Sequence, residues 1–353
     1  MQQTPSSLGW RMPAEWEPHQ GTWLAWPHNR SDWPGKFGPI PWVYADIILH
    51  LTRCEFVHLL VDSPAHKKQV LRVLKKCGIP RDKVRLFSMA TNRVWTRDYG
   101  PTFVRSPTGQ LGMIDWAFNA WAKYDDWESD NRIPSLIQSR LELPIWQPMH
   151  DQWHIVMEGG SIDVNGQGLL LTTEECLLDT VQQRNPCMSR SDIESALRDY
   201  LGVKKILWLH RGIVGDDTHG HVDDLARFVN ENTVVTVTEE DPDDANYELL
   251  QENLHRLQNM TNLAGQPLDI VTLPMPAPVV FQEQRLPASY ANFYIANDCV
   301  LVPTFNDPKD RIALDILATQ FPNREVIGIH ALDLVWGLGT LHCMTQQQPK
   351  TSC

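Results

Sequence analysis

The sequence of 353 residues lacks the features that place a protein in a membrane or on a nucleic acid. It contains no run of about 18 consecutive apolar residues, which a membrane-spanning helix needs. Lys and Arg number 31 against 43 Asp and Glu, and the net charge of −12 repels phosphate backbones and anionic lipid headgroups. We therefore expect no nucleic acid and no membrane partner, and the charge mildly favours a cationic small-molecule ligand.

Marks of secretion and of domain division are also absent from the sequence. The opening residues contain no basic segment followed by an apolar run. The seven cysteines are odd in number, widely spaced and without a Cys-x-x-Cys motif, which is typical of reduced thiols in a cytoplasmic protein. No linker or block of like charge divides the chain, so the simplest interpretation is one domain over residues 1–353.

Five helices are predicted, with short β-rich runs between them. The third helix has a predicted capping box at Ser191–Glu194. A unit of several strands plus one helix, used about five times, accounts for this alternation and predicts an α/β fold, with a doubly wound sheet as the competing architecture. The helices cover residues 64–77, 131–141, 191–201, 241–262 and 308–320, and the strands cover 56–61, 84–87, 102–105, 204–209, 233–237, 299–302 and 324–329.

The densest cluster of polar side chains is the run from Gly215 to Asp224. Within it, His221 and Asp223 are two positions apart, and on an extended segment such side chains point to the same face. An imidazole that transfers a proton would then lie beside a carboxylate that binds a cation. The alternative is a solvated acidic loop before a strand.

A cysteine near the C-terminus follows two glycines. In the segment Trp336–Thr345, Gly337 and Gly339 let the backbone approach a ligand closely, and Cys343 is a candidate nucleophile. A buried inert thiol is the alternative, and is the commoner role of a cysteine. His342 has no predicted role, because alternation along a strand would turn its side chain away from Cys343.

Two further carboxylates stand beside glycines. Asp98 lies between an aromatic-rich run and a Gly-Pro turn, and Glu158 precedes Gly159-Gly160, where the lack of large side chains leaves room for a planar ligand. Each residue also has a purely structural interpretation. Asp98 would be a turn acceptor or a partner of Arg97, and Glu158 would belong to a hairpin turn.

Together these segments supply a thiol, an imidazole and three carboxylates, which suits the hydrolysis of a guanidinium group. A guanidinium is planar, cationic and poorly electrophilic. Paired carboxylates hold its N–H groups by charge-assisted hydrogen bonds and place its carbon against the sulfur. The thiolate, stabilised by the cation and by an imidazolium, then attacks that carbon.

Eight segments resemble the agmatine deiminase (agmatine iminohydrolase) family, which is related to bacterial peptidylarginine deiminases. The resemblance runs from about Met12 to Pro349. It implies a five-bladed pseudosymmetric α/β propeller of the guanidino-group-modifying superfamily and a single catalytic domain. It also implies the hydrolysis of agmatine to N-carbamoylputrescine and ammonia, a step towards putrescine. The segments are MPAEWEPHQGTWLAWP, WTRDYGPTFV, IDWAFNAW, MEGGSIDVNGQG, LLTTEECLL, GHVDD, PASYANFYIAN and LHCMTQQQP.

The resemblance also implies roles for individual residues. The family's nucleophile falls on Cys343, its acid/base histidine on His221, and its guanidinium-binding acids on Asp98 and Asp223. The thiolate would attack the guanidinium carbon, ammonia would leave, and water would release the product from a covalent thiouronium. No metal or organic cofactor is implied. Among the expected substrate contacts are also Glu158, the active-site glutamate, and Trp95, the substrate-side aromatic residue.

The chain departs from the family pattern in three places near the expected pocket rim. Gly337–Leu341 replaces a Gly-Gly-Gly-Asn run, His219-Gly220-His221 replaces Asp-Gly-His, and Ala122–Trp127 replaces a glycine-rich stretch. No catalytic group is lost by these changes. Peptidyl-arginine or another guanidine compound therefore stays open as the substrate.

Two other functions compete with this interpretation. The spacing His219-x-His221-x-Asp223 is that of a binuclear zinc motif and would indicate a metal-dependent hydrolase, although the motif continues with Asp224 where another histidine is usual. The 14 tryptophans would also suit a non-catalytic amine-binding protein. Loss of activity with a chelator would favour the first, and an unchanged function in Cys343→Ser would favour the second.

Overall fold

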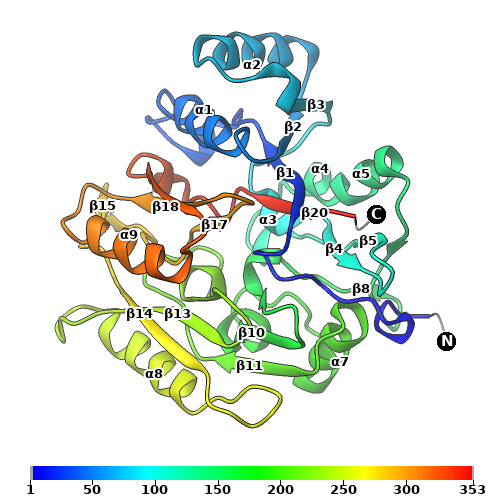
Figure 1. Ribbon diagram of the computed structural model, residues 1–353, viewed down its shortest axis with the longest axis vertical. Helices are drawn as coiled ribbons and strands as arrows, with labels where there is room; N and C mark the ends of the chain where they lie inside the picture. The colour runs from blue at the N-terminus through cyan, green and yellow to red at the C-terminus, as the bar shows by residue number, and fades with distance from the viewer. Residues whose placement is uncertain (1–2, 352–353) are drawn as a thin grey trace.

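The computed structural model describes residues 3–351, and most of their strands lie in five sheets of three or four strands (Figure 1). Each of these sheets contains one antiparallel pair, and its parallel connections run through helices. In spatial order, the first sheet contains β20 (Gln346–Pro349), β1 (His19–Ala25), β2 (Phe56–Val61) and β3 (Val84–Ser88), and the second contains β4 (Thr102–Arg105), β5 (Leu111–Ile114) and β6 (Ile145–Trp146). The third sheet contains β11 (Lys205–Leu209), β10 (Leu169–Thr173) and β9 (Asp163–Val164), and the fourth contains β12 (Ala226–Phe228), β13 (Thr233–Thr238) and β14 (Asp269–Pro274). The fifth sheet contains β17 (Tyr294–Ile295), β18 (Cys299–Thr304) and β19 (Glu325–His330). Short hairpins are formed by β7 (Met149–His150) with β8 (Trp153–His154) and by β15 (Val280–Phe281) with β16 (Gln284–Arg285).

Four of the five predicted helices are confirmed to within two residues, as α2, α5, α7 and α9. The predicted helix over 241–262 is shorter, because α8 covers only Tyr247–Gln258. Helix α1 is missing from the prediction, since Pro39 and Pro41 at its start suggest a loop. Proline is tolerated there because the first N–H groups of a helix have no partner within it. The α-helices are α1 (Ile40–Leu51), α2 (Pro64–Lys76), α3 (Thr96–Tyr99), α4 (Glu128–Asn131), α5 (Ile133–Leu141), α6 (Glu174–Leu178), α7 (Arg190–Leu201), α8 (Tyr247–Gln258) and α9 (Lys309–Gln320).

The predicted capping box at Ser191–Glu194 is wrong, because the box of α7 is formed by Ser189 and Asp192. Ser189 Oγ accepts a hydrogen bond from the backbone N–H of Asp192 (3.3 Å), and Asp192 Oδ2 accepts one from the backbone N–H of Ser189 (2.8 Å). The extended backbone of Ser189 (φ −80°, ψ 169°) makes it the residue that precedes the helix. Ser191 already lies within the first turn.

The α/β class and the recurring unit of strands plus helix are confirmed by the five sheets. In each unit an antiparallel pair is followed by a helical crossover to a parallel strand, as from β12 through β13 and α8 to β14. The strands belong to separate sheets, so the doubly wound sheet is wrong. The arrangement of the units as five blades around a common axis stays a prediction.

The two ends of the chain meet in the first sheet, where β20 pairs with β1 (Figure 1). Trp23 lies opposite Gln346 in the register, and its indole N–H donates to Gln348 Oε1 (3.0 Å). Trp23 is also almost fully buried, at 1% exposure. The pairing places the segment just before β20, which contains Cys343, against the segment that contains Asp98.

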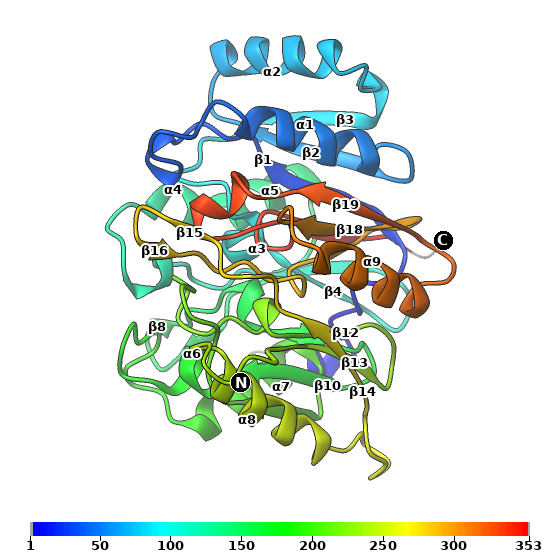
Figure 2. The same ribbon diagram turned by 90° about the vertical axis from the view of Figure 1, so that its left-hand side faces the viewer.

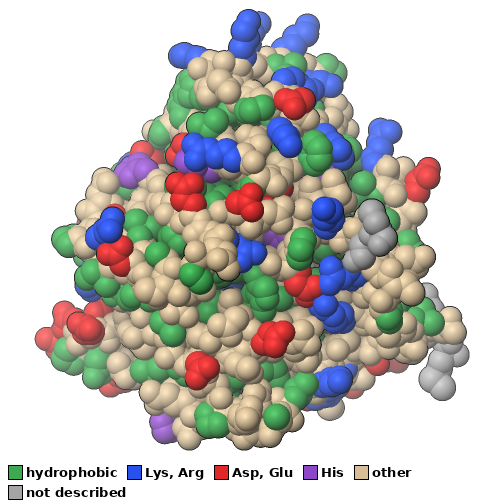
Figure 3. Space-filling view, in the orientation of Figure 1, with side chains coloured by type: hydrophobic (Ala, Val, Ile, Leu, Met, Phe, Trp, Pro, Cys, Tyr) green, Lys and Arg blue, Asp and Glu red, His purple; other side chains and the backbone are tan. Residues whose placement is uncertain are grey.

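Charge is unevenly distributed over the surface. Helix α2 lies at one end of the molecule, beyond α1 and β2 (Figures 1 and 2), and Lys and Arg side chains gather there (Figure 3). The basic residues therefore form a local face on a protein whose net charge is −12. Among the described residues, no helix is both long and apolar enough to cross a membrane.

Candidate active site

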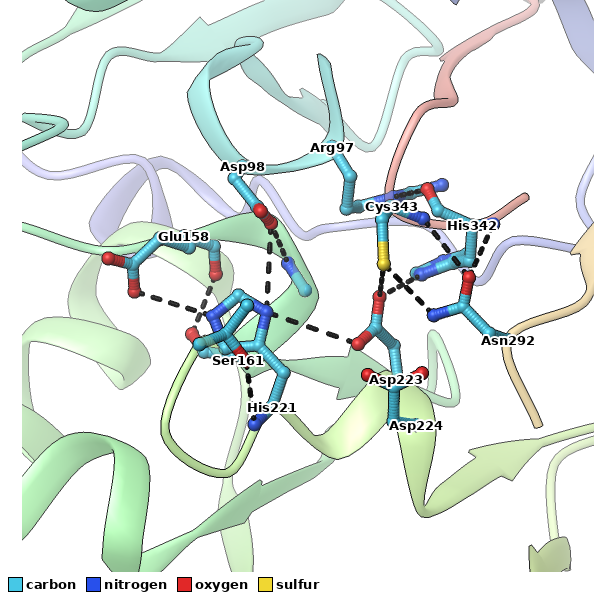
Figure 4. Close-up of polar contacts among 12 residues, drawn as sticks. Arg97, Asp98, Glu158, Ser161, His221, Asp223, Asp224, Asn292, His342 and Cys343 are labelled. Carbon is cyan, nitrogen blue, oxygen red and sulfur yellow. Dashed lines mark hydrogen bonds and ion pairs between the residues drawn. The ribbon is translucent and has the colours of Figure 1, made fainter. Parts of the chain in front are cut away.

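Cys343 lines a cavity of about 210 Å³ together with Trp95, Asp98 and Trp121. Its Sγ accepts a hydrogen bond from the side-chain amide of Asn292 (3.1 Å; Figure 4). The thiol is shielded from bulk solvent, with 4% of Cys343 exposed. The predicted nucleophile and two of the other predicted site residues, Trp95 and Asp98, therefore share one cavity.

Two glycines let the backbone approach these side chains. A Cβ at Gly339 would lie 2.8 Å from the Trp95 ring and 3.2 Å from Cys343 Cβ. A Cβ at Gly160 would lie 2.5 Å from His221 Nδ1 and 2.9 Å from Asp98 Oδ1. Any larger residue at Gly160 would therefore clash with two predicted catalytic groups. The segment Gly159–Ser161 is a short 3-10 helix, so the hairpin-turn interpretation of Glu158 is wrong.

Asp98 is held in the short helix α3 by two hydrogen bonds that fix its carboxylate plane. Trp121 Nε1 donates to Oδ2 (3.0 Å), and the backbone N–H of Gly160 donates to Oδ1 (3.2 Å). The Arg97 guanidinium instead lies against Glu15 Oε2 (3.5 Å). Asp98 is therefore not the partner of Arg97, and its carboxylate is free to face the cavity.

His221 lies between three carboxylates (Figure 4). Its Nδ1 is 3.8 Å from Asp98 Oδ1 and 4.0 Å from Asp223 Oδ1, and its Nε2 is 3.7 Å from Glu158 Oε2. The predicted convergence of His221 and Asp223 is confirmed, but the extended segment is wrong, because Val222–Asp224 forms a 3-10 helix. The solvated loop is also wrong, since both side chains are buried.

Several polar atoms at this site have no hydrogen-bond partner among the described residues. They are both ring nitrogens of His221, Asp223 Oδ1 and Glu158 Oε2. Buried polar atoms are rarely left without a partner, because desolvation costs about 1–3 kcal/mol for each. Of these atoms, the oxygens of Asp223 and Glu158 are acceptors, and they suit a cationic group with N–H donors.

Glu158 is held by an ion pair with Arg184, a residue that was not predicted from the sequence. Arg184 Nε donates to Glu158 Oε1 (3.0 Å), and its terminal nitrogen donates to the carbonyl of Thr218 (2.5 Å). Burial alone would raise the pKa of Glu158, but Arg184 and His221 outweigh it and lower that pKa to about 2. Glu158 is therefore ionised throughout the physiological range.

The cluster of carboxylates shifts the pKa of its neighbours. Burial, with the nearby Asp223 and Glu158, raises the pKa of Asp98 to about 7 although His221 opposes this. Burial, Asp223 and Asp98 raise the pKa of the Cys343 thiol well above its ordinary value. For His221, burial favours the neutral ring, but Asp98 and Glu158 raise its pKa well above 6.5. The site without a ligand therefore combines a thiol with an imidazolium.

The sequence profile of the Porphyromonas-type peptidyl-arginine deiminase family matches residues 11–349. The chain belongs to this family. An agmatine deiminase of Pseudomonas aeruginosa (strain LESB58) is 35% identical over 98% of this chain and 97% of its own length. Two solved structures are also similar. The agmatine deiminase of Enterococcus faecalis has a TM-score of 0.91 at 33% identity, covering 99% of this chain and 98% of its own. A cysteine-to-serine variant of C. jejuni agmatine deiminase with substrate bound has a TM-score of 0.86 at 31% identity, covering 97% of each chain.

The deiminase family motif around Cys343 also contains His342, whose expected orientation is wrong. His342 Nδ1 donates to Asp223 Oδ2 (2.7 Å), and its Nε2 donates to Glu15 Oε2 (2.8 Å; Figure 4). Side chains do not alternate between two faces here, because residues 341–344 form a turn and not a strand. Asn292 Oδ1 accepts the backbone N–H of His342 (3.0 Å), which fixes this turn. No local sequence signal distinguishes this role, because Glu15 and His342 come from opposite ends of the chain.

The spacing His219-x-His221-x-Asp223, which is that of a binuclear zinc motif, does not bring these three residues together as one set of metal ligands in this member of the deiminase family. His219 has a positive φ of 64° and its Nε2 lies 3.3 Å from Asp179 Oδ2. His221 instead groups with Glu158 and Cys176, while His219 groups with Glu175 and Asp179. The metallohydrolase interpretation thus loses the geometry on which it depends.

The segment Ala122–Trp127, where the chain departs from the deiminase family pattern, lies at the cavity. Tyr124 lines the cavity, and its hydroxyl donates to Asp217 Oδ2 (2.7 Å). Lys123 forms an ion pair with the same carboxylate. The segment is therefore attached to the loop that precedes His221, and through Tyr124 it bounds the cavity.

Proposed function

We propose that this chain is an agmatine deiminase that acts as a single catalytic domain over residues 1–353. The observation that carries the proposal is the convergence of Cys343, Asp98, Asp223, His221 and Glu158 on one buried site. The agmatine deiminases among its relatives support agmatine as the substrate. The product would be N-carbamoylputrescine, and the reduced cysteines favour a cytoplasmic location.

The guanidinium would bind between Asp98 and Asp223. Asp223 Oδ1 has no protein partner among the described residues, and Asp98 is oriented by Trp121 and Gly160. Charge-assisted hydrogen bonds to planar N–H groups would satisfy these acceptors. Trp95 would contact the aliphatic tail or the terminal ammonium of the substrate.

Binding of the cation would also activate the thiol. The carboxylates that raise the pKa of Cys343 are those that the guanidinium would neutralise, so that pKa falls as the substrate enters. The thiol proton leaves to solvent, and the thiolate forms a bond to the guanidinium carbon. His221 protonates the departing nitrogen, and ammonia leaves a covalent thiouronium on Cys343.

The second half of the reaction uses the neutral imidazole. His221 takes a proton from water, which attacks the thiouronium carbon. The carbon–sulfur bond breaks, the ureido product leaves, and Cys343 is regenerated. Glu158, held by Arg184, stays ionised beside His221 Nε2 and stabilises the imidazolium in both halves.

The proposal is tested by release of ammonia and of ureido product from agmatine, free arginine and a peptidyl-arginine ester, each with and without a chelator. Turnover of agmatine that resists the chelator, lost in Cys343→Ala and kept in the exposed Cys187→Ala, is the expected result. Turnover of only another guanidine would retain the chemistry and replace the substrate. Chelator sensitivity would indicate a metal hydrolase, and agmatine binding without turnover would indicate a binding protein.

A further inference from the structure

A second thiol, Cys176, lies next to two residues of the acid/base step in the proposed reaction, His221 and Glu158. One ring nitrogen of His221, one carboxylate oxygen of Glu158 and the sulfur of Cys176 all lie within 4.8 Å of one another. All three residues are buried, with at most 2% of each exposed. The proposed deiminase reaction gives Cys176 no role. We refer to Glu158, Cys176 and His221 as the Cys176 cluster.

The surrounding structure holds the Cys176 cluster in place. Thr173, which precedes helix α6, accepts the backbone N–H of Cys176 at its hydroxyl (3.1 Å) and donates that hydroxyl to the carbonyl of Gly220 (2.5 Å). The same side chain thus ties Cys176 to the residue that precedes His221. On the other side, Arg184 holds Glu158 through Oε1 only. The cluster is therefore formed in advance, by bonds that do not use its free donor atoms.

Two donor atoms of the Cys176 cluster have no hydrogen-bond partner within the described part of the chain. They are His221 Nε2 and Glu158 Oε2, which lie 3.7 Å apart. This distance is too long for a hydrogen bond. It is close to the separation of about 3.3 Å between two ligands that each lie about 2.0 Å from a tetrahedral metal ion. Because buried polar atoms are rarely left unpartnered, the pair points to a ligand between them.

The donors of the Cys176 cluster are those that zinc prefers, namely a thiolate sulfur, an imidazole nitrogen and a carboxylate oxygen. Charged groups also lie behind two of them. Arg184 Nε donates to the other oxygen of Glu158 (3.0 Å). Nδ1 of His221 faces Asp98 Oδ1 at 3.8 Å and Asp223 Oδ1 at 4.0 Å. Such outer partners orient metal ligands, and three protein ligands leave a fourth position for water.

Two other groups of His, Cys, Asp and Glu side chains are less suitable for a metal ion. In the first, His219 Nε2 already lies 3.3 Å from a carboxylate oxygen of Asp179, whose side chain is 40% exposed. In the second, the sulfur of Cys343 already accepts a hydrogen bond from Asn292 (3.1 Å). The two groups are Glu175, Asp179 and His219, and Asp223, Asp224 and Cys343.

We propose that Zn²⁺ binds to Glu158, Cys176 and His221 and inhibits the enzyme. Zinc would take the place of the imidazolium proton between His221 Nε2 and Glu158 Oε2, with Cys176 bound as the thiolate. The ring proton and the thiol proton pass to solvent. A ring nitrogen bound to zinc can neither protonate the departing ammonia nor take a proton from water. The inhibition rests on the proposed function, whereas the binding of zinc does not.

Cobalt(II) is the probe for the metal site, because a cobalt–thiolate bond gives an ultraviolet charge-transfer band. The full-length, metal-free Cys343→Ala protein is titrated with Co²⁺, so that the catalytic thiol cannot be the ligand. The expected result is a thiolate band that saturates at one equivalent and disappears when Zn²⁺ is added. Cys176→Ser in this background should lose the band, and Glu158→Gln should weaken cobalt binding at least about 10-fold.

Control variants distinguish the Cys176 cluster from other donors. Cys187→Ser, at an exposed cysteine, and His219→Ala, in the neighbouring group, should keep the band in the same background. Absence of the band in Cys343→Ala, or a band that survives in Cys176→Ser, would overturn the proposal.

The inhibition is measured as ammonia release from agmatine. His221 lies between Glu158 and the side of the site that contains Cys343 (Figure 4), so zinc is added well before the substrate. Zinc should stop turnover by the wild-type protein, and excess EDTA should restore it. Cys176→Ser should keep its basal turnover and need at least about 10-fold more zinc for the same inhibition.

Equal sensitivity of wild type and Cys176→Ser to zinc would overturn the inhibitory role. Cys187→Ser should be inhibited like the wild-type protein. If the metal-free wild-type protein does not turn over agmatine, the proposed function fails, and the cobalt titration still decides whether the metal site exists.

Discussion

His342 and Asp223 are joined by a hydrogen bond of 2.7 Å, and the oxygen that accepts it, Oδ2, also lies 3.7 Å from the Cys343 sulfur. One carboxylate thus links the proposed nucleophile to the residue that precedes it. The other ring nitrogen of His342 donates to Glu15, which Arg227 holds in turn (2.8 Å). Because all these groups are buried, the position of Asp223 depends on residues that do not touch the cavity.

We expect His342→Ala to lower kcat/KM at least about 10-fold, because a charge-assisted hydrogen bond that orients Asp223 is lost. The variant should also be destabilised by about 3 kcal/mol, since two buried carboxylates lose their shared partner. Steady-state kinetics and urea unfolding measure the two effects. The exposed His255→Ala serves as control. Unchanged kinetics in a folded His342→Ala protein would contradict the positioning role.

Gly160→Ala should abolish turnover without unfolding the protein. The added methyl group would lie 2.5 Å from His221 Nδ1 and 2.9 Å from Asp98 Oδ1, so at least one of these groups must move. The matched control is Gly38→Ala, where nothing lies within 4 Å of the new Cβ. If Gly160→Ala kept more than about a tenth of wild-type activity, the site would tolerate this displacement. That result would contradict the expectation that catalysis requires the observed geometry of His221 and Asp98.

Trp121→Phe should reduce kcat/KM about 10-fold, because the indole N–H that fixes Asp98 Oδ2 is removed while an aromatic ring is kept. The effect should appear mainly in KM if the hydrogen bond serves guanidinium binding. Trp42→Phe, at a site with 44% exposure, is the control. Equal kinetics in the two variants would remove Trp121 from the site.

The affinity for agmatine should depend on pH through Asp98. Its pKa of about 7 in the folded protein is raised above the ordinary value of 3.8, so the folded state retains a proton that the unfolded state has lost. This contribution to stability is present at low pH and disappears as the pH rises through about 7, where Asp98 ionises. A cation bound to Asp98 favours the ionised form, and binding below pH 7 must therefore release a proton.

Calorimetry with the inactive Cys343→Ala protein measures this linkage. The Kd for agmatine should increase by up to about 10-fold for each pH unit below 7, with release of about one proton on binding. Asp98→Asn in the same background should bind weakly and lose this dependence. A Kd that is constant between pH 5 and pH 8 would contradict the raised pKa or the contact of Asp98 with the cation.

The sequence predicted those parts of the molecule that depend on local patterns. Helix α2, for example, has a capping serine, Ser63, and lysines in its last turn, and its bounds were predicted almost correctly. Helix α1 was missed because its prolines dominate the local pattern, although Tyr44 and Ile48 give it a buried face. Tertiary packing, which stabilises that helix, is not visible in a window of sequence.

In the candidate site, too, local patterns predicted some residues and missed those that depend on tertiary contacts. Cys343, Asp98, Asp223, His221 and Glu158 each lie in a recognisable motif, and the structure brings all five together. The residues that hold these five side chains in place were not predicted. Arg184 lies outside the quoted family segments, and Glu15 lies in the first of them without a predicted role. Their roles arise from long-range contacts with Glu158 and His342.

The pairing of β20 with β1 also sets the order in which the protein can mature during synthesis. The first sheet lacks one of its strands until residues 346–349 have been made, and Cys343 belongs to the same late segment. Contacts between distant parts of the chain form slowly. A nascent chain would therefore expose the edge of β1 until residues 346–349 have been made, and the deiminase site would be assembled no earlier than that segment.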